Sequence, residues 1–131
     1  MLSLDSNTVS DILRCRPDVL ERYEMETKKR SKIAICDIVY YEVVRGLELI
    51  GAKKKIKEFM LMYEEMVHLQ LDMKAINKAV DIYLELHKGQ QIEDNDIYIA
   101  AIAMVNGCTL VTANEKHFSR IEGLTYVNWR I

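Results

Sequence analysis

The segment from Asp96 to Asn114, DIYIAAIAMVNGCTLVTAN, decides the fold class of this chain. Its first ten residues are almost all apolar, which predicts a deeply buried helix that ends at Asn106 and Gly107. The run from Thr109 to Thr112 follows at once and predicts a strand. A helix that leads through a glycine turn into a strand is typical of α/β proteins.

The same alternation of short apolar runs and longer helical patterns extends along the rest of the chain. Residues 2–4, 32–36 and 67–69 are further predicted strands, and residues 126–127 are a predicted edge strand. Helical crossovers between strands predict a mainly parallel sheet, because each crossover returns to the same sheet edge with right-handed chirality. We therefore expect an α/β fold in one domain spanning residues 1–131, with a sheet of four to five strands and helices on both faces. The helices expected between the strands are residues 6–13, 17 to about 30, 38–49 with Asp37 as cap, 53–65, a helix from Asp72 that stops at Gly89, and the helix from residue 94 onward.

Composition fits one globular domain without covalent or metal staples. Of the 131 residues 50% are hydrophobic, enough to bury a core of its own. Cys15, Cys36 and Cys108 form no CxxC pair, and we interpret them as buried apolar residues of a protein in the reducing cytoplasm. A net charge of -2 excludes a protein that binds nucleic acid by bulk basicity, although a local basic groove remains open. No apolar run approaches the ~20 residues of a membrane span, and no secretory signal is expected.

Polar residues at the carboxyl ends of parallel strands carry functional weight, because the ligand crevice of an open parallel sheet lies there. Asp5 follows the first predicted strand, and Glu42 lies in the second turn of an apolar helix. Asp94 and Asp96 open the buried helix, and Asn114 follows the predicted strand at residues 109–112.

Each of these acids also fits a structural role. Asp5 or Ser6 fits a helix cap, and the two acids at positions 94 and 96 favour the positive end of a helix dipole. Glu42 interrupts an apolar face, yet its helical row also contains Arg45 and is compatible with a solvated face. Convergence favours function, because carboxylates gathered in one crevice repel each other unless a divalent cation lies between them. Without nearby His or Cys ligands, such a set favours Mg²⁺ or Mn²⁺ over Zn²⁺.

Other site chemistries lack their sequence signatures. The chain has no GxGxxG or GxxxxGK[ST] phosphate loop, no GxSxG elbow, and no metal-ligand spacing among its three histidines. A phospho-signalling receiver domain would need paired acids after its first strand and a lysine at the end of a late one. Leu4-Asp5-Ser6 provides a single acid and Val127-Asn128 provides no lysine.

Several motifs stand in a specific order along the whole chain. Leu4-Asp5-Ser6-Asn7 lies near the start, Glu42 is followed by Arg45-Gly46, and Asp96-Ile97-Tyr98-Ile99-Ala100-Ala101 matches a DxxIAA pattern. The C-terminal block adds Gly107, Leu110-Val111-Thr112-Ala113-Asn114, Phe118, Gly123-Leu124 and Asn128-Trp129. In order and spacing, the chain resembles the PIN-domain ribonucleases, and most closely the VapC-type toxins of toxin–antitoxin pairs.

This resemblance implies a metal-dependent endoribonuclease. Asp5, Glu42 and Asp96 would be the catalytic acids and would hold one or two Mg²⁺ or Mn²⁺ ions, with Asn114 and Asp94 as further candidate ligands. The ion would lower the pKa of a bound water and orient it at a phosphodiester, so the protein needs no nucleophile of its own. Ser6, Arg45 and Asn114 are the candidate substrate-binding residues.

One departure from the family pattern lies after the TxN motif. Many family members have a further acid there, whereas this chain reads Asn114-Glu115-Lys116-His117. His117 stands where an acid is common, which puts a second metal position in doubt. His117 also fits a surface residue.

RNA binding requires cations in spite of the acidic total. Arg45 and the basic runs at residues 28–32 and 53–57 can supply them, although such runs are usually solvated helix faces. The resemblance also implies a homodimer and a small antitoxin that covers an apolar groove. The stripe of Ile56, Phe59, Met60 and Tyr63 fits either the core or that groove.

Two functions from different classes follow from the sequence. The first is a metal-dependent ribonuclease toxin that hydrolyses RNA. The alternative is a non-catalytic PIN-like binding or assembly module that kept the fold and lost a metal ligand.

Overall fold

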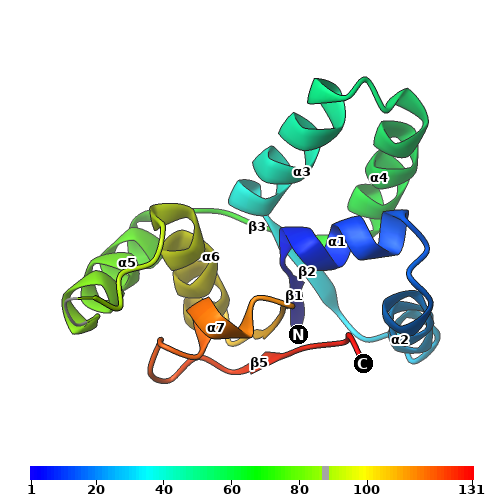
Figure 1. The fold of residues 1–131 in the computed structure, drawn as a ribbon. Coiled ribbons are helices and arrows are strands. Elements are labelled where there is room, and N and C mark those ends of the chain that lie inside the picture. The colour runs from blue at the N-terminus through cyan, green and yellow to red at the C-terminus, as the bar shows by residue number, and fades with distance from the viewer. Residues whose placement is uncertain (87–88) are drawn as a thin grey trace.

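The computed structural model describes residues 1–86 and 89–131, and in this part of the chain five parallel strands form one sheet (Figure 1). The strand order is β3-β2-β1-β4-β5, so the first strand in the sequence lies in the middle of the sheet. The predicted α/β fold with a parallel sheet is thereby confirmed, including the edge strand near the C-terminus. The strands are β1 (Leu2–Leu4), β2 (Ile33–Cys36), β3 (Val67–Leu69), β4 (Thr109–Val111) and β5 (Tyr126–Val127).

Helices flank both faces of the sheet. They are α1 (Ser6–Leu13), α2 (Pro17–Lys28), α3 (Asp37–Leu49), α4 (Lys53–Glu65), α5 (Met73–Glu85), α6 (Asp94–Val105) and α7 (Glu115–Phe118). In Figure 1, α5 and α6 lie on one side of the central strands, α1 and α2 lie on the other, and α3 and α4 form a hairpin that stands out from the rest. The helix predicted to stop at Gly89 ends earlier, because α5 ends at Glu85 and its cap Leu86 already has extended backbone. Residues 87–88 lie outside the described residues. No described helix is both long and apolar enough to cross a membrane.

The register of β1 fixes the position of the residues that follow it. Ser3 pairs with Ala34 of β2 on one side, and Leu4 pairs with Val111 of β4 on the other. All four residues of β2 are buried, as expected for a strand covered on both faces. Because the strands are parallel, the segments after β1, β2 and β4 all leave the sheet at the same edge.

One predicted helix cap is wrong. Asp37 is the first residue of α3, and Cys36 takes the cap position with no side-chain hydrogen bond. The reason is that β2 runs into α3 without a loop, so the last strand residue becomes the cap. The Asp37 Oδ2 instead accepts a hydrogen bond from the backbone N–H of Leu71, 3.1 Å away, and ties α3 to the segment after β3.

The interpretation of the cysteines holds for two of the three. Cys36 and Cys108 are buried, and burial raises the pKa of the Cys36 thiol to about 12. Cys15 is exposed, which contradicts the sequence-based interpretation. It lies in the turn between α1 and α2 with φ at 58°, because the chain must reverse there before α2 begins at Pro17.

Candidate active site

Three acidic side chains from three elements gather at the carboxyl end of β1. Asp5 directly follows β1, Glu42 lies in the second turn of α3, and Asp96 lies in the first turn of α6. Glu42 and Asp96 are close enough to Asp5 for their charges to raise the pKa of its carboxyl group. We call these three residues the acid cluster. The sequence motifs that contain them are separated by up to 91 positions, and the parallel topology brings them together.

Asp5 is the most enclosed member of the acid cluster. Its side chain accepts hydrogen bonds from the backbone N–H of Ser6 at 2.8 Å, from the Thr112 hydroxyl at 2.7 Å and from the Asn7 amide at 3.3 Å. Asp5 is only 3% exposed. Burial raises the pKa of its carboxyl group from 3.8 to about 6, and the charges of Asp96 and Glu42 add to the increase although two hydrogen bonds oppose it. The folded protein therefore destabilises the ionised form of Asp5, and a nearby cation would stabilise it.

Glu42 has one oxygen with a partner and one without. The Asn95 amide donates to its Oε2 at 3.4 Å, which links α3 to the residue before Asp96. Its Oε1 is buried and has no hydrogen-bond partner. A buried carboxylate oxygen without a partner is costly, and it is the kind of atom that a bound cation satisfies.

Asp96 is held by residues that follow β4. The Nδ1 atom of His117 lies 2.9 Å from the Asp96 Oδ2 and 2.8 Å from the Asn114 Nδ2. The backbone N–H of Asn114 donates in turn to the Thr112 hydroxyl, which donates to Asp5. One continuous polar network therefore connects two members of the acid cluster.

Thr112 and Asn7 are parts of this site that the sequence analysis did not single out. Thr112 is fully buried, and its hydroxyl is shared between Asp5 and Asn114. The Asn7 Oδ1 accepts from the backbone N–H of Ala113 at 3.1 Å, so Asn7 joins α1 to the segment after β4. Both residues lie within the sequence motifs described above, and Thr112 lies at the carboxyl end of a predicted strand, which are the signals that could have identified them.

Asp94 does not belong to the acid cluster. It is exposed and lines a hollow of about 190 Å³ between α5 and α6 together with Tyr83 and Tyr98. It is not the cap of α6 either, because Glu93 occupies that position and its carbonyl accepts from the backbone N–H groups of Asp96 and Ile97. Residues two positions apart in a helix point about 200° apart, so Asp94 and Asp96 cannot face the same site.

A groove between α1 and α3 opens beside the acid cluster. It has a volume of about 400 Å³ and contains Ser6 and Arg45, two of the candidate substrate-binding residues. The guanidinium of Arg45 lies 4.9 Å from the ring centroid of Tyr41, a cation–π geometry that restrains the side chain. Arg14 also lines this groove and adds a second cation. Asn114, the third candidate, lies in the polar network instead.

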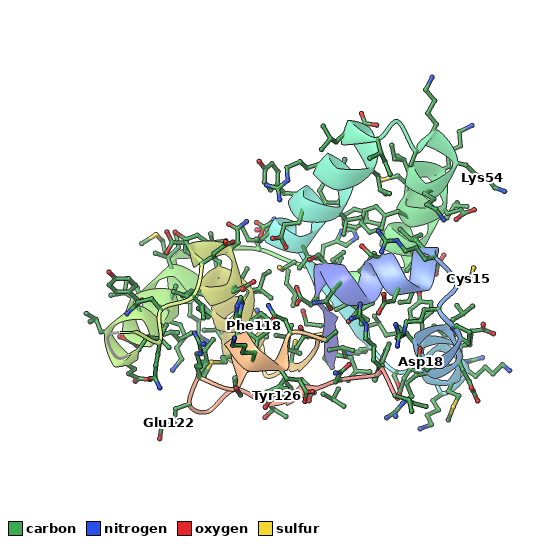
Figure 2. All side chains as sticks on the ribbon, viewed as in Figure 1. Cys15, Asp18, Lys54, Phe118, Glu122 and Tyr126 are labelled. Carbon is green, nitrogen blue, oxygen red and sulfur yellow. The ribbon has the colours of Figure 1, made fainter. Side chains whose placement is uncertain are left out.

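The two basic runs differ from this groove in position. Figure 2 shows Lys54 at the outer end of α4, far from α6 and α7. Lys55 donates to the backbone carbonyl of Leu13 at 2.9 Å and thereby joins α4 to α1. In the stripe on the same helix, Phe59 is fully buried and packs with Tyr40 and Tyr63. The other stripe residues, Ile56, Met60 and Tyr63, are half-buried.

The acid cluster fits a hard divalent cation that keeps some of its water. Among residues 1–86 and 89–131, no three His, Cys, Asp or Glu side chains are grouped closely enough to form a complete metal site. Mg²⁺ typically binds through one or two carboxylates and retains several waters, so a complete protein cage is not required. The unpartnered Glu42 Oε1 and the raised pKa of Asp5 are the two observations that a cation would explain.

Comparison with known sequences places this arrangement among related proteins. The profile of the PIN domain matches residues 2–124. Ribonuclease VapC2 of Haemophilus influenzae is 30% identical over 132 aligned residues, which cover 96% of each chain. The tRNA(fMet)-specific endonuclease VapC of Salmonella typhimurium is 29% identical with the same coverage.

A solved structure shows the same architecture. The crystal structure of VapBC2 from Rickettsia felis, bound to a DNA fragment from its promoter, contains a chain that superposes with a TM-score of 0.85. The two chains are 28% identical, and the match covers 98% of each.

Proposed function

This chain belongs to the PIN-domain family, and on that premise we propose that it is a metal-dependent endoribonuclease and the toxin of a toxin–antitoxin pair. The observation that carries the proposal is the acid cluster itself. Asp5, Glu42 and Asp96 repel one another at one edge of the sheet, and no cation from the described residues pairs with Asp5 or Glu42. Such an arrangement costs stability and is retained where a ligand or a reaction needs it.

The three acids would hold Mg²⁺ or Mn²⁺. Asn95 restrains one oxygen of Glu42 and leaves its Oε1 available, whereas Thr112 and the backbone N–H of Ser6 each restrain one oxygen of Asp5. When bound, the ion supplies a more acidic water and stabilises negative charge on the phosphodiester oxygens. The protein side chains orient the site, and no side-chain nucleophile is required.

The groove between α1 and α3 would bind the RNA backbone next to the acid cluster. Arg45 and Arg14 can neutralise phosphates there, and Ser6 can donate a hydrogen bond to a phosphate oxygen. Because both arginines lie beside an acidic site, they would also offset the repulsion between the acid cluster and the phosphodiester.

The partners proposed for this chain follow from its relatives. The similar Rickettsia structure is a VapBC complex, and the similar Salmonella protein is named for tRNA(fMet). We propose a small antitoxin of the VapB kind as the partner of this chain, a homodimer as its own assembly, and RNA as its substrate.

The test is cleavage of total RNA by the purified full-length chain with Mg²⁺, with Mn²⁺ and with a chelator. We expect cleavage with either ion, none with the chelator, and none by a triple variant with Asn, Gln and Asn in place of Asp5, Glu42 and Asp96. A folded wild type that leaves RNA intact with both ions would contradict the proposal. That result would favour the alternative of a non-catalytic binding module. The described residues include no group of three His, Cys, Asp or Glu side chains that could hold a metal ion, which is compatible with this alternative. Mapping the cut sites would identify the RNA.

A further inference from the structure

Helix α5 presents an apolar surface that the described part of the chain leaves uncovered. Figure 1 shows α5 on the outer side of α6, away from the sheet. Its inner face is buried and contains Ala75, Ala79 and Ile82. The apolar side chains of its outer face are each more than half exposed, and they are Met73, Val80, Tyr83 and Leu84. A contiguous apolar surface on a folded domain is typical of an interaction site.

Four charged side chains run beside this surface in an order that is unfavourable for an isolated helix. Lys74 and Lys78 lie in the N-terminal half of α5, and Asp81 and Glu85 lie in its C-terminal half. We call these four residues the charged row. Cations near the N-terminus and anions near the C-terminus oppose the helix dipole. The two lysines are four positions apart, as are the two acids, and like charges at this spacing repel each other. Among the described residues, no member of the charged row forms an ion pair.

A second copy of α5, packed antiparallel, would offset both of these costs. At 3.6 residues per turn, the charged row lies within about 60° around the helix, directly beside the exposed apolar side chains. In a pair related by a twofold axis, each surface meets the same surface of the other copy in reverse order. Lys74 then faces Glu85 of the second copy and Lys78 faces its Asp81, because both pairs have one midpoint, between positions 79 and 80. The twofold axis repeats both ion pairs.

The hollow between α5 and α6 fits the same arrangement. It has a volume of about 190 Å³, and its walls include Ile76, Val80, Tyr83 and Tyr98. Ile76 and Tyr83 have the same midpoint as the two charged pairs. The twofold axis therefore places the exposed Tyr83 ring of each copy over the hollow of the other. An aromatic side chain that fills an apolar hollow is typical of the centre of a stable interface.

We propose that α5 is the surface through which two copies of this chain pair, antiparallel and selected by the charged row. The inference rests on the homodimer of the proposed function, and it names the surface and the chemistry of recognition. A second copy pairs every member of the charged row with an opposite charge. This self-complementarity favours a second copy over a partner of unrelated sequence, such as the antitoxin.

Charge reversal tests the proposed pairing, with the mass of the full-length chain measured by sedimentation velocity. We expect the wild type to be a dimer. One double variant is Lys74→Glu with Lys78→Glu, and the other is Asp81→Lys with Glu85→Lys. In each, the charged row has one sign and repels its own copy, so the dissociation constant of the dimer should rise by about a hundredfold or more.

Rescue separates lost recognition from misfolding. An equimolar mixture of the two double variants should form a heterodimer, because an acidic row then faces a basic row. A quadruple variant that combines all four changes should dimerise again. The matched control, Lys54→Glu with Lys57→Glu, reverses two exposed charges on α4 and should remain a dimer. Circular dichroism and thermal unfolding establish that each variant is folded.

The outcomes also separate this inference from the ribonuclease. A dimer that persists in both double variants, or folded monomers that do not pair on mixing, would overturn the role of α5. A wild type that is monomeric alone would overturn it as well, and if the charge-reversed variants then failed to bind the antitoxin, α5 would be assigned to that partner. RNA cleavage by a monomeric wild type would leave the ribonuclease intact, and a dimer without cleavage would leave the α5 pairing intact.

Discussion

Two regions at opposite ends of α1 contain buried acids, and they differ in whether those acids have a cationic partner. In the acid cluster, Asp5 and Glu42 have no cationic partner among the described residues, and the pKa of Asp5 rises to about 6. At the corner where α1, α2 and the C-terminal segment meet, Asp11 is equally buried but forms two hydrogen bonds to the guanidinium of Arg130, at 2.7 and 3.0 Å. We call this second region the C-terminal corner.

Asp18 makes the contrast sharper. Figure 2 shows it beside α2, where the backbone N–H of Ile131 and the side chain of Arg16 donate to its carboxylate. These hydrogen bonds lower the pKa of Asp18 to about 2. The comparison shows that Asp11 and Asp18 are paired with donors within the chain, whereas Asp5 and Glu42 of the acid cluster have no cationic partner among the described residues.

The largest expected effect separates Asp96 from Asp94 in the same helix turn. Asp96→Asn removes a proposed ligand charge and should reduce the rate of RNA cleavage by about a hundredfold or more. Asp94→Asn changes an exposed residue and should leave the rate within about twofold. Both rates are measured on the same RNA with Mn²⁺. Loss of activity at Asp94 and not at Asp96 would show that the wrong carboxylate was assigned.

The next effect is on stability, and its sign should differ between the two regions. A shift in the pKa of Asp5 from 3.8 to about 6 corresponds to about 3 kcal/mol of destabilisation near pH 8 without metal. Asp5→Asn should recover a large part of that free energy of unfolding while losing cleavage. Asp11→Asn should instead lower the free energy of unfolding by about 1 to 2 kcal/mol, because it breaks a charged hydrogen-bonded pair. Denaturant titrations at pH 8 measure both changes. If both variants changed the free energy of unfolding in the same direction, the proposed difference between the acid cluster and the C-terminal corner would be wrong.

The pH profile tests the same shift in the unmodified protein. Unfolded Asp5 releases its proton near pH 3.8 and folded Asp5 only near 6, so the folded state is favoured while this group is protonated. Its contribution to stability should therefore fall as pH rises from about 4 to about 6 and stay constant above. The difference in free energy of unfolding between the wild type and Asp5→Asn isolates this contribution. A difference that does not vary with pH would mean that Asp5 is not strained by burial.

Metal should reverse the strain of the acid cluster and leave the C-terminal corner unaffected. Mg²⁺ or Mn²⁺ at a hundredfold excess over its dissociation constant stabilises the folded state by about 2.7 kcal/mol, which corresponds to a rise of several degrees in the melting temperature. The triple variant at Asp5, Glu42 and Asp96 should show no rise, and Asp11→Asn should show the full rise. A rise retained by the triple variant would place the ion elsewhere.

The smallest effect concerns Asp18 at low pH. The lowered pKa means that ionised Asp18 contributes stability above pH 3.8, and that this contribution is lost as pH falls toward 2. Asp18→Asn should therefore lower the melting temperature slightly at pH 5 and not at pH 2. Because the group is close to solvent, added salt should weaken the effect at pH 5.

The fold and the position of the acid cluster could be predicted from the sequence, because both depend on the order and direction of the strands. Strand and helix periodicities and the parallel topology place Asp5 and Asp96 at one edge of the sheet regardless of side-chain detail. The family resemblance supplied the proposed role of Glu42, because periodicity alone did not decide whether this residue lies on a solvated face or in a site.

Other features depend on tertiary contacts that no local pattern encodes. The partner of Asp37 is the backbone of Leu71, and the cap of α6 is Glu93, which makes no side-chain hydrogen bond at that position. The helix α7 has only four residues and therefore no periodicity to detect, yet it carries His117 to Asp96.

The central position of β1 also determines the order in which parts of the fold can form during synthesis. The hydrogen bond from Thr112 to Asp5 closes a loop of 107 positions, and β1 cannot complete its pairing with β4 until the chain has been synthesised through Val111. Contacts this distant in sequence form late and slowly, because closing the loop between them costs conformational entropy before any favourable contact forms. A growing chain that ends before Thr112 has no partner for the Asp5 carboxylate and no turn to carry His117. The complete network around Asp5 and Asp96 therefore cannot form in a nascent chain that ends before His117.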